Sequence, residues 1–182
     1  MKKRNKISSE EVFNHKYFKV NKDIVELPNG EKVEWFYWNS RDSAMVVAET
    51  PKGKLVMVKQ FRYLPDQVAL EFPSGHSDEG ESIEDCALRE FEEETDYTCE
   101  NLTLLGKFFE TMGQLNRQIH IYSGKCAKKI NGKTKQSDIT EDIEVVLLDF
   151  DEVVEMAKEN KIISMGSSLA ILLTGARRRE NA

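Results

Sequence analysis

The chain has 182 residues, 40% of them hydrophobic and 32% charged, and carries a formal net charge of −6. This length suits one compact α/β domain with at most a small subdomain, and the negative charge argues against general affinity for nucleic acid, which depends on basic surface. No segment approaches the ~18 consecutive apolar residues of a membrane span, and the N-terminus lacks the apolar core of a secretory signal, so we expect a cytoplasmic protein with no membrane partner.

The first element expected is a β-hairpin within residues 16–38. Its two extended runs are joined by Asn29-Gly30, a pair that supplies the positive φ angles of a tight turn. The second run carries four aromatic residues in succession: Trp35, Phe36, Tyr37 and Trp38. Two of them must point away from whichever face is buried, where they either pack in a bent sheet or form a dimer interface or base-stacking platform. A small antiparallel β subdomain is therefore expected over residues 1–42, before a main domain over residues 43–182.

A second hairpin is predicted over residues 44–49 and 54–61, because two apolar runs flank a Pro-Lys-Gly turn. A short strand over residues 68–72 follows and stops at Pro73-Ser74-Gly75. Beyond that loop the apolar residues recur at three- to four-residue intervals, which indicates a helix.

This helix should begin near Ile83 and end near Thr95. Its start is marked by Ser82, which with Asp85 three residues later resembles a capping box. The helix and the loop before it form the informative segment of the chain, GHSDEGESIEDCALREFEEETDY, over residues 75–97.

Three glutamates share one face of this helix. Glu90, Glu93 and Glu94 stand at positions i, i+3 and i+4, so their like charges repel unless a cation balances them. Hard oxygen ligands favour Mg²⁺ or Mn²⁺ over zinc. Arg89 lies four residues before Glu93 and can pair with it, which would keep that carboxylate ionised. The alternative is a solvated acidic face, but the glycine-ending turn, Glu81 just ahead of the helix and the position of Arg89 favour a metal site.

Three more strands are predicted after the helix, over residues 102–109, 118–123 and 143–148. The polar stretch 128–142 is long enough to suggest a functional loop. Two helices end the chain at about residues 151–160 and 167–179. This order of elements favours a mixed sheet packed between helices.

The acidic segment resembles the Nudix box, G-x5-E-x7-R-E-U-x-E-E-x-G-U, where U is aliphatic or aromatic. The matching residues are Gly75, Glu81, Arg89, Glu90, Phe91, Glu93, Glu94 and Tyr97. Asp96 stands where the family has glycine, at the helix C-terminus, where a left-handed conformation is usual. The resemblance implies the Nudix α/β/α sandwich with a mixed sheet.

The resemblance also implies the roles of these residues. Glu90 and Glu94 would be metal ligands, together with the backbone carbonyl of Ser74, and Glu93 would be a ligand directly or through water. Glu93 and Glu94 would thereby be catalytic. Two or three Mg²⁺ ions, with Mn²⁺ as the alternative, would clamp a pyrophosphate and lower the pKa of an attacking water. Supporting residues that do not touch the metal would be Gly75, Glu81 and Arg89.

Beyond the box, the chain resembles the ADP-ribose and nucleoside-diphosphate-sugar pyrophosphatase branch of the family. Residues 59–63, Lys-Gln-Phe-Arg-Tyr, resemble a strand end whose arginine reaches substrate phosphate, which makes Arg62 the candidate; its alternative is a surface ion pair. Residues 71–75, Glu-Phe-Pro-Ser-Gly, resemble the branch's E-x-P-A-G. The N-terminal subdomain resembles the one that members exchange to form homodimers, so we expect dimerisation there, with Trp35 stacking on the nucleobase.

Three further positions follow from this resemblance. Met112 and Gly113 align with the S-P-G loop that lines the substrate, although Met112 replaces its proline and Arg117 replaces the acidic residue that follows. Glu141 aligns with a glutamate that contacts metal and acts as general base; the alternative is a loop carboxylate in solvent. His120 lies inside a strand pattern and is expected to be structural.

The predicted function is Mg²⁺-dependent hydrolysis of the pyrophosphate bond of a nucleoside diphosphate sugar, such as ADP-ribose or GDP-mannose, to a nucleoside monophosphate and a sugar phosphate. An alternative with the same fold is a housecleaning or dinucleoside-polyphosphate hydrolase. An alternative of another class is a non-catalytic nucleotide-sugar sensor, which the presence of every expected ligand carboxylate disfavours.

Overall fold

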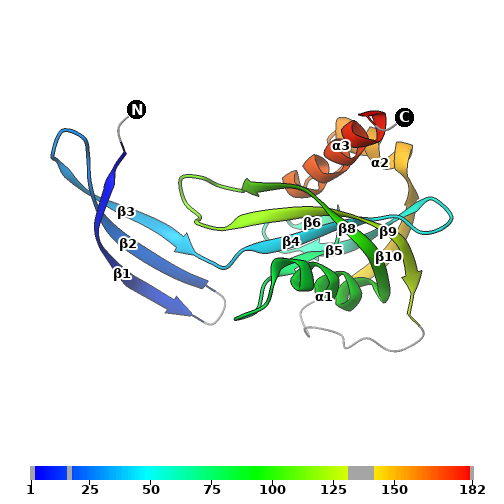
Figure 1. Cartoon of the computed structure of the whole chain (residues 1–182), viewed down its shortest axis with the longest axis horizontal. Helices are drawn as coiled ribbons and strands as arrows, with labels where there is room; N and C mark the ends of the chain where they lie inside the picture. The colour runs from blue at the N-terminus through cyan, green and yellow to red at the C-terminus, as the bar shows by residue number, and fades with distance from the viewer. Residues whose placement is uncertain (1–2, 16–17, 131–141, 181–182) are drawn as a thin grey trace. The chain divides into compact units, whose positions relative to one another are not determined.

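The computed structural model describes residues 3–15, 18–130 and 142–180. The chain divides into two compact units, each described by itself (Figure 1). The first unit comprises Met1–Arg41 and Phe109–Gln118, and the second comprises Asp42–Phe108 and Ile119–Ala182. The segment 109–118 therefore joins the N-terminal unit, although it lies far from it in sequence.

The first unit contains a three-stranded antiparallel sheet of β1 (Asn5–His15), β2 (Phe18–Glu26) and β3 (Lys32–Asn39), with β2 in the centre. The predicted hairpin is confirmed as β2–β3. Its turn is closed by Leu27, whose N–H donates to Glu31 O at 2.7 Å and whose carbonyl accepts from Gly30 N at 2.9 Å. Within this fully described turn only Gly30 has a positive φ, of 85°, so the expectation that Asn29 would share it is wrong.

Strand β1 was not predicted from the sequence. Its register with β2 shifts between Lys6 and Ser8 and again between Glu11 and Phe13. Each shift interrupts the two-residue alternation of side chains, so Ile7 and Val12 give no strand period. Every residue of β1 is also exposed, which removes the apolar pattern that marks a buried strand.

The second unit has two sheets. A four-stranded sheet has the order β7-β4-β9-β8, and a three-stranded sheet has the order β10-β5-β6. The strands are β4 (Ser43–Ala48), β5 (Lys54–Arg62), β6 (Gln67–Glu71), β7 (Ser74–His76), β8 (Tyr97–Phe109), β9 (Gln118–Lys129) and β10 (Ile143–Asp149). The sheets are mixed, because β4 pairs parallel with β9 but antiparallel with β7.

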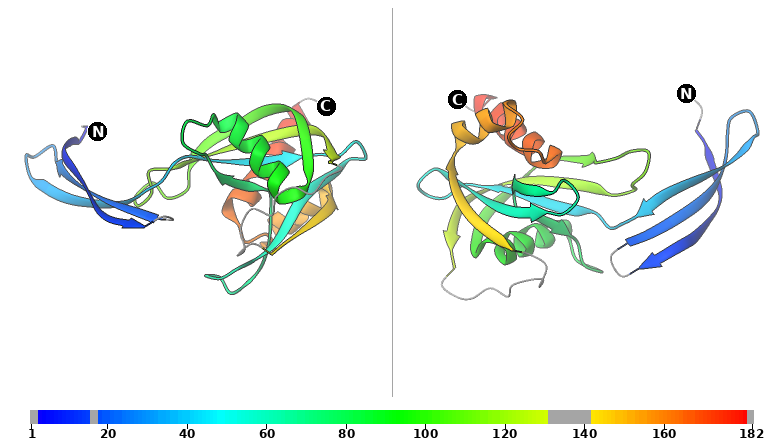
Figure 2. Two further views of the ribbon diagram at one scale, coloured as in Figure 1. Left: turned by 90° about the horizontal axis from the view of Figure 1, so that it is seen from below. Right: turned by 180° about the vertical axis from the view of Figure 1, so that it is seen from behind.

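Helices cover the sheets from two sides: α1 (Ile83–Thr95) from one, α2 (Phe150–Lys158) and α3 (Met165–Glu180) from the other (Figures 1 and 2). Strand β4 lies between these two helical layers. All of its residues are buried, and its apolar side chains alternate between two cores. Met45 and Val47 belong to the core that holds Val153 of α2 and Ile171 of α3. Ala44, Val46 and Ala48 belong to the core that holds Phe91 of α1. The predicted α/β/α sandwich is confirmed.

Two departures from the predicted strands concern the edges of the four-stranded sheet. Residues 73–75 were expected to be a loop, but Ser74 begins the three-residue strand β7, which pairs with β4. Strand β8 begins at Tyr97, earlier than the predicted start at residue 102. Asn101, with φ of 57°, interrupts the alternation of its side chains, so the first part of the strand shows no strand period in the sequence. In the part of the chain that the structure describes, no helix is long and apolar enough to cross a membrane.

Candidate active site

Helix α1 carries the acidic face, and both of its ends are capped. Ser82 precedes the helix with an extended backbone, and its hydroxyl accepts a hydrogen bond from Asp85 N at 3.1 Å. At the other end Asp96 has the left-handed φ of 59°, and its N–H donates to Glu92 O. Both predicted ends of the helix are therefore confirmed. Cys86, Ala87 and Phe91 are buried in the core, and Glu90 and Glu94 lie beside them on the helix, where they meet β7.

Arg89 is the centre of the carboxylate cluster. Its guanidinium donates to both oxygens of Glu81, from Nε to Oε1 at 2.7 Å and from Nη2 to Oε2 at 2.9 Å. Nη1 donates to Glu90 Oε1 at 2.8 Å and to Glu93 Oε2 at 3.1 Å. Nη2 also donates to the carbonyl of His76 at 3.0 Å, which ties the helix to β7. The predicted pairing with Glu93 is thus present, within a larger network that sequence spacing did not indicate.

This network fixes the charges of Glu81 and Arg89. The hydrogen bonds from Arg89 lower the pKa of the Glu81 carboxyl from 4.5 to about 2. The same bonds, first of all that with Glu81, raise the pKa of the Arg89 guanidinium. Glu81 is therefore held as an anion that orients Arg89, and Arg89 in turn orients Glu90 and Glu93.

Gly75 allows the carboxylate of Glu90 to lie against the backbone of β7. A Cβ atom at position 75 would lie 2.0 Å from Glu90 Cδ and 2.2 Å from Glu90 Oε1. Real atoms do not approach so closely, so any larger residue would displace the carboxylate. The glycine of this loop is explained by that contact.

Glu94 reaches the same short strand. Ser74 N donates to Glu94 Oε2 at 3.1 Å. Strand β7 is itself held against β4, where Met45 pairs with Ser74 and Ala44 with Gly75. The carboxylates of Glu90 and Glu94 therefore both meet the backbone of Ser74 and Gly75.

The donor set suits a hard divalent cation. Within the described residues, no three His, Cys, Asp or Glu side chains converge closely enough to hold a metal ion by themselves, and Glu90 and Glu93 are held by Arg89. Mg²⁺ does not need such a cage, because it is usually bound by one or two carboxylates together with water and substrate phosphate. Carboxylate and carbonyl oxygens at Ser74, Glu90 and Glu94 fit that requirement.

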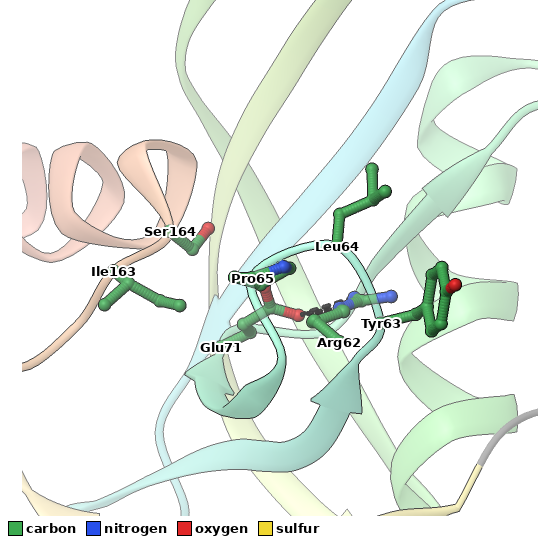
Figure 3. Close-up of a pocket in the computed structure, with 7 residues that line it drawn as sticks. All are labelled: Arg62, Tyr63, Leu64, Pro65, Glu71, Ile163 and Ser164. Carbon is green, nitrogen blue, oxygen red and sulfur yellow. Dashed lines mark hydrogen bonds and ion pairs between the residues drawn. The ribbon is translucent and has the colours of Figure 1, made fainter.

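Arg62 ends strand β5 and is paired with Glu71 of β6. Both its Nε, at 3.0 Å, and its Nη2, at 2.5 Å, donate to Glu71 Oε2. The pair lines a pocket of about 410 Å³ (Figure 3). The sequence had offered an ion pair as the alternative to a phosphate ligand at Arg62, and the ion pair is present. Glu71 was not predicted as the partner of Arg62. In the register of the two strands Glu71 lies opposite Val58 and Arg62 lies opposite Gln67, so the pair forms between residues that are not directly opposite each other.

The remaining candidate residues are in the first unit or outside the described residues. Trp35 is on β3 of the first unit, with the Arg4 guanidinium 5.4 Å from its ring centre. Met112 and Gly113 also belong to the first unit, in the segment between β8 and β9, and Met112 is exposed. Glu141 lies outside the described residues.

Two side-chain contacts were missed by sequence reasoning because their partners carry no local signal. His120 is buried on β9, with Nε2 3.1 Å from Asp42 Oδ2 across 78 residues of sequence. Arg117 donates to Glu110 Oε2 from Nε at 2.6 Å, at the base of the 111–116 segment. The departure from the branch at Arg117 therefore has a structural partner in this chain.

Comparison with known proteins adds to this geometry. The NUDIX domain model matches residues 39–165, and a model described as the nucleoside diphosphate sugar hydrolase N-terminal domain matches residues 5–39. The methanol dehydrogenase activator of Bacillus methanolicus is 32% identical, and the ADP-ribose pyrophosphatase of Bacillus subtilis 30%; each match covers 91% of this chain and 89% of the relative.

The GDP-mannose pyrophosphatase of Yersinia enterocolitica is 28% identical over 84% of this chain and 85% of its own. A crystal structure of an ADP compounds hydrolase superposes with a TM-score of 0.84 at 17% identity, over 100% of this chain and 97% of that one. This structural match concerns the fold.

Proposed function

Because the chain belongs to the Nudix family and is a Nudix hydrolase, we propose that it cleaves the pyrophosphate bond of a nucleoside diphosphate sugar in a Mg²⁺-dependent reaction. The products would be a nucleoside monophosphate and a sugar phosphate. Relatives named for ADP-ribose and for GDP-mannose both match most of the chain, so these two compounds are the first substrates to test. The match of residues 5–39 to a nucleoside diphosphate sugar hydrolase N-terminal domain supports the same class.

The observation that carries this proposal is the contact of two carboxylates of α1 with the backbone of β7. Glu90 lies against Gly75, and Glu94 accepts from Ser74 N. A pyrophosphate carries several negative charges, and these carboxylates would repel it without a cation between them. Ser74, Glu90 and Glu94 would hold Mg²⁺, with Mn²⁺ as the alternative, in a cluster of two or three ions. Bound Mg²⁺ would neutralise charge on the pyrophosphate and acidify a water that attacks phosphorus.

The protein's own part is to hold the carboxylates in place. Glu81 and Arg89 hold Glu90 and Glu93 in defined positions, so little reorganisation is needed when substrate arrives. Glu93 would ligate directly or through water. We assign the general base to Glu141 on the resemblance of its sequence position, and Glu93 and Glu94 complete the catalytic set.

Substrate recognition would use Arg62, Trp35, Met112 and Gly113. Arg62 would bind phosphate through guanidinium hydrogens that its pair with Glu71 leaves unused, because both of the bonds in that pair run to Oε2. Trp35 would stack on the base, and Met112 and Gly113 would border the substrate. We also propose a homodimer that forms through the N-terminal subdomain, residues 1–42.

A substrate panel tests the proposal. Purified protein would be incubated with ADP-ribose, GDP-mannose and other nucleotide sugars, with damaged deoxynucleoside triphosphates and with dinucleoside polyphosphates, each with and without Mg²⁺. Nucleoside monophosphate and sugar phosphate should appear from nucleotide sugars only with the metal. Faster turnover of the other two classes would favour a housecleaning or dinucleoside-polyphosphate hydrolase. Tight binding of nucleotide sugars without turnover would favour a sensor.

A further inference from the structure

The pocket beside Arg62 has the size and lining of a small-molecule site. Its volume of about 410 Å³ falls within the range of roughly 300–1,000 Å³ typical of such sites. Two segments form it: the β5–β6 turn with the strand ends beside it, and the residues just before α3. The lining residues are Arg62, Tyr63, Leu64, Pro65, Glu71, Ile163 and Ser164. In Figure 3, Ile163 and Ser164 approach from one side of the Arg62–Glu71 pair, and Leu64 and Tyr63 from the other.

The polar groups of this pocket leave hydrogen-bonding capacity for a ligand. Both bonds of the ion pair use Glu71 Oε2, so Glu71 Oε1 is an acceptor outside that pair. The Arg62 guanidinium has five N–H donors, and the pair uses two of them. Ser164 adds a hydroxyl whose oxygen accepts from Ser167 N at 3.4 Å and whose hydrogen can be donated to a ligand. A ligand with hydroxyl groups and an anionic group matches this set.

The remaining lining is apolar, from Leu64, Pro65 and Ile163, with one aromatic ring at the rim. A sugar likewise has both apolar and polar surface, since its ring C–H groups form an apolar face and its hydroxyl groups form a polar edge. A nucleobase would need an aromatic stacking partner that is held in place, whereas the Tyr63 ring, which also lines the pocket, is 85% exposed.

The pocket adjoins the backbone at which the pyrophosphate would be cleaved. Glu71 precedes Ser74 by three residues, and three residues of fully extended chain span at most about 10 Å. The half of a nucleoside diphosphate sugar that leaves with the sugar is of comparable length. We propose that this pocket binds the sugar-phosphate half of the substrate, with Arg62 at the phosphate and Glu71 and Ser164 at the sugar hydroxyls. This inference rests on the proposed function and names the subsite within it.

Binding of the product half tests the proposal without requiring turnover. Mannose 1-phosphate and ribose 5-phosphate would be titrated against the full chain by saturation-transfer NMR, with GMP and AMP as the comparison. Ile163→Trp places an indole in the pocket and should weaken binding of the sugar phosphates by about tenfold or more. Leu64→Trp, at a position that is 92% exposed, is a second variant that does not disturb the core.

Leu172→Trp is the matched control, because Leu172 is 44% exposed on α3 and Ile163 is 41% exposed just before it. The control should bind sugar phosphates as the wild type does. The proposal is overturned if the wild type binds neither sugar phosphate at millimolar concentration, if both pocket variants bind them unchanged, or if the variants weaken only GMP and AMP. Failure of the wild type to hydrolyse any nucleotide sugar would instead overturn the proposed function. The binding measurements do not depend on turnover, so they separate failure of the sugar-phosphate subsite from failure of the proposed function.

Discussion

Arg89 gives the three glutamates of α1 unequal surroundings. It bonds Glu90 and Glu93 directly, whereas Glu94 bonds the backbone of β7. Its bidentate partner Glu81 supplies the charge that holds it in place. A row of like charges that would repel on a bare helix is thereby ordered by one cation from the protein itself. The pairing with Glu93 could be predicted, because the two residues are one helical turn apart. The pairing with Glu81 could not, because it depends on how the loop before the helix folds back.

Replacing Glu81 with Gln should lower the free energy of unfolding at neutral pH by about 1–2 kcal/mol, because it removes a charged pair of hydrogen bonds. The folded state lowers the pKa of this carboxyl from 4.5 to about 2. Its stabilisation is therefore fully present above about pH 4.5 and is lost as the pH falls towards 2. Urea unfolding of the wild type and the variant across this range measures the difference.

The control is Glu79→Gln, on the exposed turn two residues earlier. It should leave the unfolding curve unchanged at every pH. A Glu81→Gln protein that stays less stable by the same amount down to the lowest pH would show that the carboxylate charge is not the cause.

At the scale of elements, α1 was the most predictable part of the chain. Its start is marked in the sequence by the capping residue Ser82, and its length by the apolar period. Its end was predicted at the position where the family has glycine, and Asp96 has the left-handed conformation there. Strands β1 and β7 were not predicted, for opposite reasons. Two register shifts disrupt the alternation of β1, and β7 is a three-residue strand within a Pro-Ser-Gly segment that reads as a turn. Since β7 presents Ser74 and Gly75 to the carboxylates, the geometry of the site required the structure.

Replacing Asp96 with Gly should stabilise the protein by about 1–2 kcal/mol. The residue has a left-handed backbone, which costs a non-glycine residue roughly 1 kcal/mol, and its Oδ1 atom is buried without a hydrogen-bond partner. Glycine removes both costs. The change in thermal midpoint, measured by calorimetry, tests this expectation.

Asp66→Gly is the matched control, since Asp66 also has a positive φ, of 52°, but lies exposed in the β5–β6 turn. It should give a smaller gain, from the backbone alone. Equal gains at the two positions would mean that the buried oxygen of Asp96 contributes nothing.

At the scale of the whole molecule, the candidate residues are divided between two units. The carboxylates, Arg62 and the pocket belong to the second unit, and Trp35, Met112 and Gly113 belong to the first. Apart from β7, the order of elements in the second unit could be predicted, because periodic segments alternate along the chain. The pairing of its strands could not: the hairpin predicted from residues 44–49 and 54–61 is wrong, since β4 and β5 lie in different sheets. The assignment of residues 109–118 to the first unit could not, because it depends on contacts such as that from Trp38 N to Gln114 O at 2.7 Å.

The most direct measurement of the central claim is Mg²⁺-dependent turnover of ADP-ribose and GDP-mannose by the wild type, Glu94→Gln and Glu92→Gln. Glutamine at position 94 can still accept from Ser74 N, so the fold should persist in the far-ultraviolet spectrum while kcat/KM falls by about 100-fold or more, equivalent to roughly 2.7 kcal/mol. Glu92 lies on the same helix but two residues away, on a different face, and its replacement should leave kcat/KM unchanged. Equal activity of Glu94→Gln and the wild type at the same Mg²⁺ concentration would contradict the account.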